Sequence, residues 1–199
     1  MQVTGERSVT AAARRSQIVT AAIETIAELG YPNASFARIA ERAGLSSTRL
    51  ISYHFDNKKE LIEQVVAEIF GEIGSFMGKR MADQDTPSAA LHAYIRGNIE
   101  FIETHRPSMM ALLSIFLSGG LAIDGEDVAT QLVHIEAILR DGQDAREFRD
   151  FDTRVMASVI QRAIEGVPLA LAGDPDLDLD AYAAELVTTF DLATQRGAS

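Results

Sequence analysis

SFARIAERAGLSSTRLISYHFDNKKEL, residues 35–61, is the stretch on which the predicted fold depends. Its first apolar side chains recur at helical spacing and form one stripe, made of Phe36, Ile39, Ala40 and Ala43. Ser35 precedes the stripe as a candidate N-cap, because its hydroxyl can accept a hydrogen bond from an unpaired backbone N–H. Gly44 follows the stripe, where a left-handed backbone conformation would end the helix without the strain that a β-carbon adds. The stretch therefore opens with a short helix and a tight turn.

A second short helix is predicted directly after this turn. Ser46 or Ser47 can cap it, and we expect Leu50 and Ile51 to face inward. The side chains left facing outward are small, hydrogen-bonding or cationic: Thr48, Arg49, Ser52 and His54. No carboxylate interrupts residues 45–55. The two helices predict a helix-turn-helix, and the second has the side chains that a helix in a DNA major groove needs.

Three short motifs in this stretch resemble one protein family. Ala-Gly-Leu-Ser at 43–46, Tyr-His-Phe at 53–55 and Lys-Lys-Glu-Leu at 58–61 are similar to the DNA-binding domain of the TetR (tetracycline repressor) family of bacterial transcriptional regulators. The remainder of the chain is similar only in length and helix pattern. One more residue lies between Gly44 and Phe55 than is usual in the family, so the alignment at the start of the second helix stays open.

The resemblance implies a set of DNA contacts. Arg49, Thr48 and Ser47 would face base edges, and arginine to guanine is the commonest specific base contact. The implied phosphate contacts are Ser35, Arg38, Tyr53, His54 and Lys58, and Ser46 and Ser52 complete the DNA-binding set. Arg14 and Arg15, on the preceding helix, could contact phosphates or the minor groove, or could simply be solvated.

Other interpretations of the same stretch remain open. A turn between two amphipathic helices can be simple αα-hairpin packing, and a helix-turn-helix can also dock protein. The alternative function is therefore a helical protein–protein interaction module. A helical-bundle enzyme is a third possibility, but the sequence offers no catalytic constellation and no nucleotide-binding motif. We expect no enzyme activity and no cofactor.

The net charge of −11 is unevenly divided along the chain. Residues 1–60 hold eight Lys or Arg against six Asp or Glu, whereas residues 61–199 hold the other ten bases and 23 acids, so the two parts carry +2 and −13. Such asymmetry is typical of a nucleic-acid-binding head on a non-binding body. An acidic surface kept for solubility would explain the body equally well.

Composition narrows the class of protein. The 199 residues contain no cysteine, which excludes disulfides and fits a reducing compartment. The hydrophobic fraction of 47% is enough for a substantial core. Nothing resembles a signal peptide, and no apolar run approaches the ~20 residues that a membrane span needs. We expect a cytoplasmic protein that does not enter a membrane.

Helical periodicity continues to the end of the chain and predicts an all-α fold of about nine helices. A first helix over residues 13–29 would support the helix-turn-helix. We expect a three-helix DNA-binding domain over residues 1–56 and a C-terminal helical bundle over residues 57–199 for ligand binding and dimerisation. The clearest later start signals are Asn57 with Glu60, at capping-box spacing, and Thr86 before Pro87.

Three glycines, Gly71, Gly74 and Gly78, stand inside the fourth predicted helix. Each costs up to ~1 kcal/mol relative to alanine within a helix. Close packing is the default explanation, and a bend or room for a ligand are the alternatives. By the resemblance, this helix links the DNA-binding and ligand-binding parts, so weakness there would ease movement.

The resemblance also implies a homodimer and a small apolar effector. The last two helices would form a four-helix bundle with the same pair of a second subunit, although both could instead close the core of one chain. The effector would enter a pocket between the fourth to eighth helices and release a palindromic DNA operator. Its implied contacts are Phe76, Tyr94, Asn98, Ile102, Met109, Met110, Leu113, Phe116 and His134. Ordinary core or rim packing is the alternative role of these residues.

We also expect no metal site. The alternating aspartates from Asp174 to Asp180 follow a calcium-loop pattern, but Leu179 stands where that loop needs glycine. Helix N-terminal charge explains them better. The four histidines, His54, His92, His105 and His134, have no metal-binding spacing.

Overall fold

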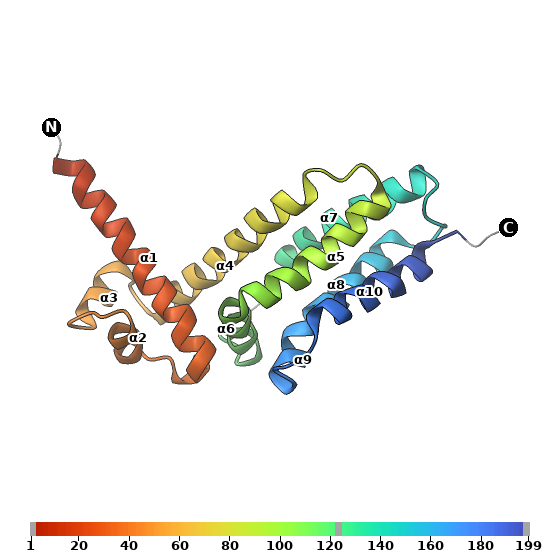
Figure 1. Ribbon diagram of the computed structural model, residues 1–199. Helices are drawn as coiled ribbons and strands as arrows, with labels where there is room; N and C mark the ends of the chain where they lie inside the picture. Colours follow the sequence, from red (N-terminus) through yellow and green to blue (C-terminus); the bar gives the residue numbers. More distant parts are fainter. Residues whose placement is uncertain (1–2, 122–124, 197–199) are drawn as a thin grey trace. The chain divides into compact units, whose positions relative to one another are not determined.

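We describe the protein from a computed structural model, whose described residues are 3–121 and 125–196; side chains are described from residue 11 and, after the gap, from residue 132. The helices are α1 (Val3–Leu29), the 3-10 turn η1 (Tyr31–Asn33), α2 (Phe36–Arg42), α3 (Arg49–His54), α4 (Lys58–Met81), α5 (Pro87–Thr104), α6 (Arg106–Leu117), α7 (Gly125–Asp144), α8 (Thr153–Glu165), α9 (Val167–Gly173) and α10 (Leu179–Thr194). Within these ranges there is no strand beyond one isolated bridge, between Phe148 and Gln195. The predicted all-α class is confirmed (Figure 1).

The helices pack as two compact units. The first unit comprises Met1–Gly71 and Arg106–Ala122, and the second comprises Glu72–His105 and Ile123–Ser199. This division follows packing, whereas the division predicted between residues 56 and 57 concerns function and stays a prediction.

In the first unit, α1 is the central helix. It packs against α2, η1 and α6, and its side chains Ile18, Ala22 and Ile26 are buried. The Tyr31 N–H donates to Ser114 Oγ at 2.8 Å, which joins the start of η1 to α6. Helix α2 is too short to bury a core alone, and it packs against α1.

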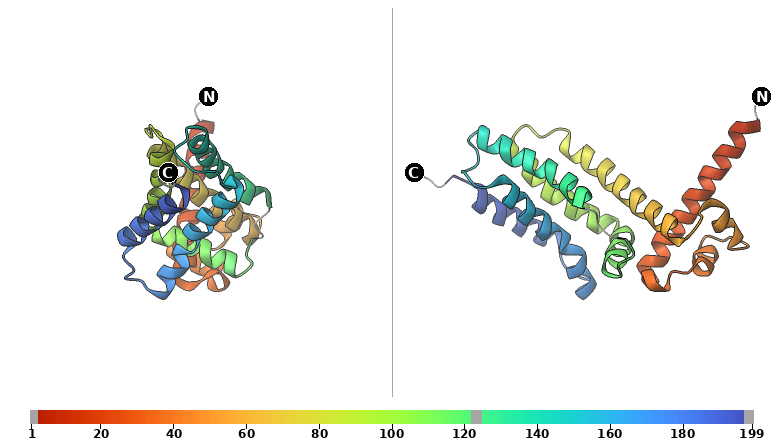
Figure 2. Two further views of the ribbon diagram at one scale, coloured as in Figure 1. Left: turned by 90° about the vertical axis from the view of Figure 1, so that its right-hand side faces the viewer. Right: turned by 180° about the vertical axis from the view of Figure 1, so that it is seen from behind.

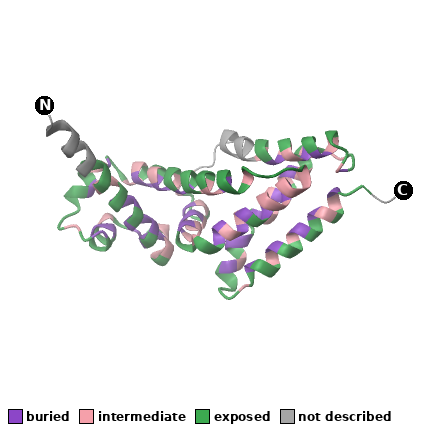
Figure 3. Cartoon of the chain, turned by 45° about the horizontal axis from the view of Figure 1, so that its top comes forward, coloured by how far each residue is buried: buried purple, intermediate pink, exposed green. Residues whose placement is uncertain are grey.

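In the second unit, α5 is the central helix. It packs against α7, α8, α9 and α10, as the two views of Figure 2 show. Leu91, Ile95 and Ile99 line its buried side. Figure 3 shows the resulting alternation of buried and exposed stripes along the helices of this unit.

The start signals in the sequence are confirmed. Thr86 is the N-cap of α5, where its hydroxyl accepts from the Ala89 N–H at 3.1 Å and Pro87 follows in the first turn. At α4, Asn57 Oδ1 accepts from the Glu60 N–H at 3.0 Å. The Glu60 carboxylate in turn accepts from the Asp56 N–H at 2.7 Å. In the usual capping box the donor is the residue after Asp56, the N-cap itself.

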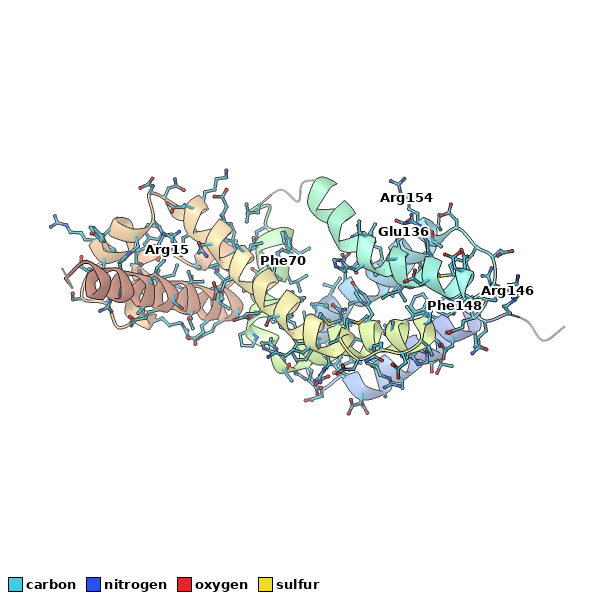
Figure 4. The ribbon with its side chains drawn as sticks, turned by 90° about the horizontal axis from the view of Figure 1, so that it is seen from above. Arg15, Phe70, Glu136, Arg146, Phe148 and Arg154 are labelled. Carbon is cyan, nitrogen blue, oxygen red and sulfur yellow. The ribbon has the colours of Figure 1, made fainter. Side chains whose placement is uncertain are left out.

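The C-terminal half has one more helix than the sequence indicated. Helix α8 ends at Gly166, and α9 begins at once with Pro168 in its first turn, so the described ranges hold ten α-helices where about nine were expected. Helix α7 continues to Asp144. A β-carbon on Gly142 would clash with the buried Phe148 ring, which is labelled in Figure 4, so this position needs glycine.

The default explanation for the glycines of α4, close packing, is wrong. Among the described residues, nothing lies within 4 Å of the β-carbon that Gly71, Gly74 or Gly78 would carry. These glycines therefore weaken α4 without a packing gain.

One stretch, Thr153–Gly173, is long and apolar enough to cross a membrane, by length and composition alone. This finding differs from the expectation that no such stretch exists. Thr153–Gly173 is the only such stretch in the part of the chain that the structure describes, and 33% of its most apolar window is buried inside the protein. Core helices of soluble proteins pass the same test. The break at Gly166 divides the stretch into two helices.

Candidate nucleic-acid interface

The turn between α2 and α3 closes as the sequence predicts. Ser35 is the N-cap of α2, where its hydroxyl accepts from the Arg38 N–H. Gly44 has a φ of +64°. Its N–H donates to Glu41 O at 3.0 Å, and the Leu45 N–H donates to Ala40 O at 2.8 Å. These paired bonds form a Schellman motif, which explains why glycine is needed at this position.

Helix α3 begins at Arg49, after Thr48 in the N-cap position. The Thr48 side chain makes no capping bond, but Ser47 Oγ accepts from the Arg49 N–H at 3.2 Å. Of the two predicted caps, Ser47 is therefore the one that supports the start of this helix.

The orientation of α3 differs from the prediction at one residue. Ile51 and Phe55, one turn apart, are buried at 0% and 1% exposure, whereas Leu50 is 37% exposed. The expectation that Leu50 faces inward is wrong. The additional residue between Gly44 and Phe55 explains the error, because it places Ile51 rather than Leu50 one turn before the buried Phe55 ring.

Most of the predicted DNA-binding side chains lie on the surface. Ser35, Arg38, Ser46, Ser47, Thr48, Arg49, Ser52 and Tyr53 are exposed, while His54 and Lys58 are half-buried. Tyr53 of α3 is 81% exposed, and the His54 ring meets its ring edge-on at 5.1 Å. Arg38 and Arg49 make no ion pair within the described ranges, unlike Arg42, which pairs with Glu24 and Glu28 of α1. The two free guanidinium groups remain available to an external anion.

Lys58 has a second set of partners that the sequence did not indicate. Its Nζ donates to Tyr31 O at 3.0 Å and lies 4.3 Å from the centroid of the Tyr31 ring. Burial lowers the pKa of this ammonium group below its ordinary value. An ammonium group has three donors, so this bond leaves donors for a phosphate.

Arg15 has a role that sequence reasoning missed. Its Nη1 donates to His54 O, at the end of α3, at 2.6 Å. The guanidinium carbon lies 4.2 Å from the centroid of the Phe55 ring, and Nη2 lies 3.3 Å from Glu60 and Gln64 (Figure 4). Arg15 thus clamps α1 to the end of α3 and the start of α4. No local sequence signal could reveal a contact between residues 39 positions apart.

The predicted ligand-binding residues are divided between the two units. In the second unit, the Tyr94 hydroxyl donates to Gln161 Oε1 at 3.0 Å, and burial raises the pKa of Tyr94 to about 12. Asn98 Nδ2 donates to Tyr94 O at 2.9 Å. The Phe76 ring meets the rings of Phe101 and His105 edge-on. Ile102 is buried, and His134, on α7, is exposed.

Four further residues of that set lie on α6, in the first unit. Met109, Met110, Leu113 and Phe116 are each half-buried. The fully buried side of α6 consists instead of Ser108, Ala111, Leu112 and Ile115. The ligand-binding role of all nine residues stays a prediction.

The other polar residues considered in the sequence have structural partners. Asp178 is the N-cap of α10 and accepts from the Ala181 N–H at 2.9 Å. His92 Nε2 lies 2.5 Å from Asp191 Oδ1, and the His105 ring stacks on Phe101 at 4.0 Å. No group of three or more His, Asp or Glu that could hold a metal occurs among the described residues.

The N-terminal segment matches a family model. Residues 18–65 match the model for bacterial regulatory proteins of the tetR family, and this segment contains α2, α3 and the turn between them. The HTH-type transcriptional regulator BetI of Ectopseudomonas mendocina is 35% identical over 107 residues, which are 53% of this chain and 54% of the relative. The chain thus spans about half the length of this curated relative.

Solved structures share the fold over most of the chain. A transcriptional regulator from Saccharomonospora viridis in complex with choline has a TM-score of 0.83 at 19% identity, over 93% of this chain and 99% of that chain. AibR in complex with isovaleryl coenzyme A and operator DNA has a TM-score of 0.76 at 17% identity, over 88% of this chain and 97% of that chain. At these identities the likeness concerns the fold.

The curated relative is a transcriptional regulator, which agrees with the expectation that this chain is not an enzyme. The family model covers the helix-turn-helix, and the solved regulators share the helices that follow it. Residues 18–65 of the chain, with the helix-turn-helix, therefore match the tetR family of bacterial regulatory proteins.

Proposed function

We propose that the protein is a cytoplasmic, ligand-responsive transcriptional repressor that binds a palindromic DNA operator as a homodimer. The observation that carries the proposal is the outward side of α3. It has exposed Thr48, Arg49 and Ser52, and no carboxylate occurs in residues 45–55. Hydroxyl and guanidinium groups are the donors and acceptors that read base edges in a major groove.

Exposed apolar side chains near the C-terminus support the homodimer. Val155 and Val159 of α8, Leu169 of α9 and Leu192 of α10 are between 52% and 74% exposed in the single chain. A second copy would cover these side chains around a two-fold axis. Such an axis would also set two copies of α3 about one DNA turn, ~34 Å, apart. Two-fold symmetry in the protein therefore predicts a palindrome in the operator.

A small apolar effector is proposed from the half-buried residues of the predicted ligand set. In the second unit, Phe76 offers an aromatic face, and Tyr94 and Asn98 offer polar groups. The Saccharomonospora viridis regulator binds choline, and AibR binds isovaleryl coenzyme A. The effector would release DNA by binding better to a conformation in which the two copies of α3 no longer match the groove spacing.

Selection from a random double-stranded DNA library, with the full chain as bait, tests the DNA-binding function. We expect enrichment of one palindromic motif. Binding to that motif should weaken steeply with salt, because cations are released from the phosphates when the protein binds. A library that yields no motif would contradict the proposal and favour the protein-docking alternative.

Two substitutions separate base contacts from phosphate contacts. Arg49→Ala should lose about 1–3 kcal/mol at one position of the motif, whereas Lys58→Ala should weaken binding to all sequences alike and lower the salt slope by about one. An equal loss for Arg49→Ala on selected and shuffled DNA would contradict the assignment of Arg49 to a base edge.

Reciprocal binding tests the effector mechanism. Choline and isovaleryl coenzyme A serve as the first probes, titrated with and without saturating operator. A probe that lowers operator affinity by some factor must itself bind more weakly to the operator complex by the same factor. An effector whose affinity is unchanged by operator would contradict this mechanism while leaving the DNA-binding function intact.

A further inference from the structure

From the orientation of α3 we infer that Leu50 determines specificity, by contacting the 5-methyl group of a thymine in the operator. The inference rests on the proposed function and adds a residue that the predicted DNA-binding set lacks. Ile51 and Phe55 anchor α3 to the core, and this anchoring turns Leu50 outward to 37% exposure. Leu50 and Tyr53 are three residues apart in the helix, so they share one side of it.

The surroundings of Leu50 favour a base edge as its partner. Thr48, Arg49 and Ser52 are exposed around it, and the absence of carboxylates from residues 45–55 removes any repulsion of phosphates. Among the groups that base pairs present in the major groove, the thymine methyl is the apolar one. Leu50, surrounded by side chains that can hydrogen-bond base edges, therefore selects thymine at the base pair that it faces.

A single exposed leucine is common on protein surfaces, so the test has to remove one methyl group and nothing else. Replacement of thymine by uracil does this, because uracil keeps every hydrogen-bonding atom of thymine. The DNA is the motif selected from the random library, with each thymine replaced in turn, and the protein is the unmodified full chain. We expect one position in each half-site to lose affinity about fourfold, the effect of exposing roughly one buried methyl group.

Two variants assign the lost contact to Leu50. Leu50→Ala should bind thymine and uracil duplexes alike at that position. Leu117→Ala is the matched control, because Leu117 is a 71% exposed leucine of the same unit that lies on α6 rather than on α3. It should retain the about fourfold preference for thymine. Circular dichroism of both variants checks that they fold.

The outcomes are distinct. If every uracil duplex binds as tightly as its parent, or if Leu50→Ala keeps the preference for thymine, the inference is wrong although the protein still binds its motif. If the library yields no motif at all, the proposed function fails, and this inference fails with it.

Discussion

At the scale of single residues, Arg15 shows how one side chain can position a helix, α3, to which it does not belong. Its guanidinium group bonds the backbone at the end of α3 and the Glu60 side chain at the start of α4, over the Phe55 ring. A planar group with five donors suits this task, because several bonds of fixed direction hold the two helices at once.

We predict that Arg15→Ala lowers the free energy of unfolding by about 1–2 kcal/mol, a value reduced for the partial exposure of the site. Arg15→Lys should recover only part of the loss, since lysine keeps the charge but not the planar group. Urea denaturation measures the effect. Arg14→Ala is the control, because the Arg14 guanidinium group donates to Gln17 of its own helix, and its loss should change stability by less than about 0.5 kcal/mol. Equal losses for the two alanine variants would contradict the clamp.

At the scale of elements, the glycines of α4 destabilise this helix, and no packing contact requires a glycine there. We predict that Gly74→Ala raises the free energy of unfolding by up to ~1 kcal/mol, because alanine restricts the unfolded chain and the added methyl meets open space. Thermal denaturation measures the gain.

Gly97→Ala is the matched control inside α5. It has the same gain in helix propensity, but its β-carbon would lie 3.0 Å from Met77 Sδ. This variant should therefore gain less than Gly74→Ala or lose stability. If Gly74→Ala were destabilising, the open surroundings of α4 would be contradicted.

The capping box at the start of α4 makes stability depend on pH. The backbone bond from Asp56 is the main reason that the pKa of Glu60 lies below its ordinary value, and Arg15 adds to it. A carboxylate with a lowered pKa stabilises the fold above its ordinary pKa, and this contribution is lost as the pH falls through the lowered value. The advantage of the parent over Glu60→Gln in urea should therefore shrink below pH 4.5. If the difference in free energy of unfolding between the parent and Glu60→Gln were the same at pH 7 and pH 3, the charge of Glu60 would not stabilise the fold.

At the scale of the whole molecule, dimerisation should depend on α8. We predict that Val159→Asp shifts the protein from dimer to monomer in analytical ultracentrifugation and weakens operator binding, since each half-site would then be bound alone. Val133→Asp is the control, because Val133 of α7 is exposed to a similar extent, 58% against 52%. Identical sedimentation of the two variants would contradict an interface at α8.

The sequence predicted what depends on neighbours along the chain. Ser35, Gly44 and Thr86 act through backbone groups a few residues away, so their cap and turn roles were readable. The contacts of Arg15 and the outward turn of Leu50 depend on packing between distant segments, which periodicity in a six-residue helix cannot resolve. The predicted DNA-binding residues lie within one local motif, whereas the predicted ligand-binding residues come from helices far apart in sequence; both sets of roles stay predictions.

The measurement that tests the central claim most directly is a fluorescence anisotropy titration of the full chain against the selected palindromic duplex and a shuffled duplex, at two salt concentrations. We predict two chains per palindrome, a preference of at least about a thousandfold for the palindrome and a steep loss of affinity at the higher salt. Equal affinity for the two duplexes, or binding that salt does not change, would contradict the claim that α3 reads DNA.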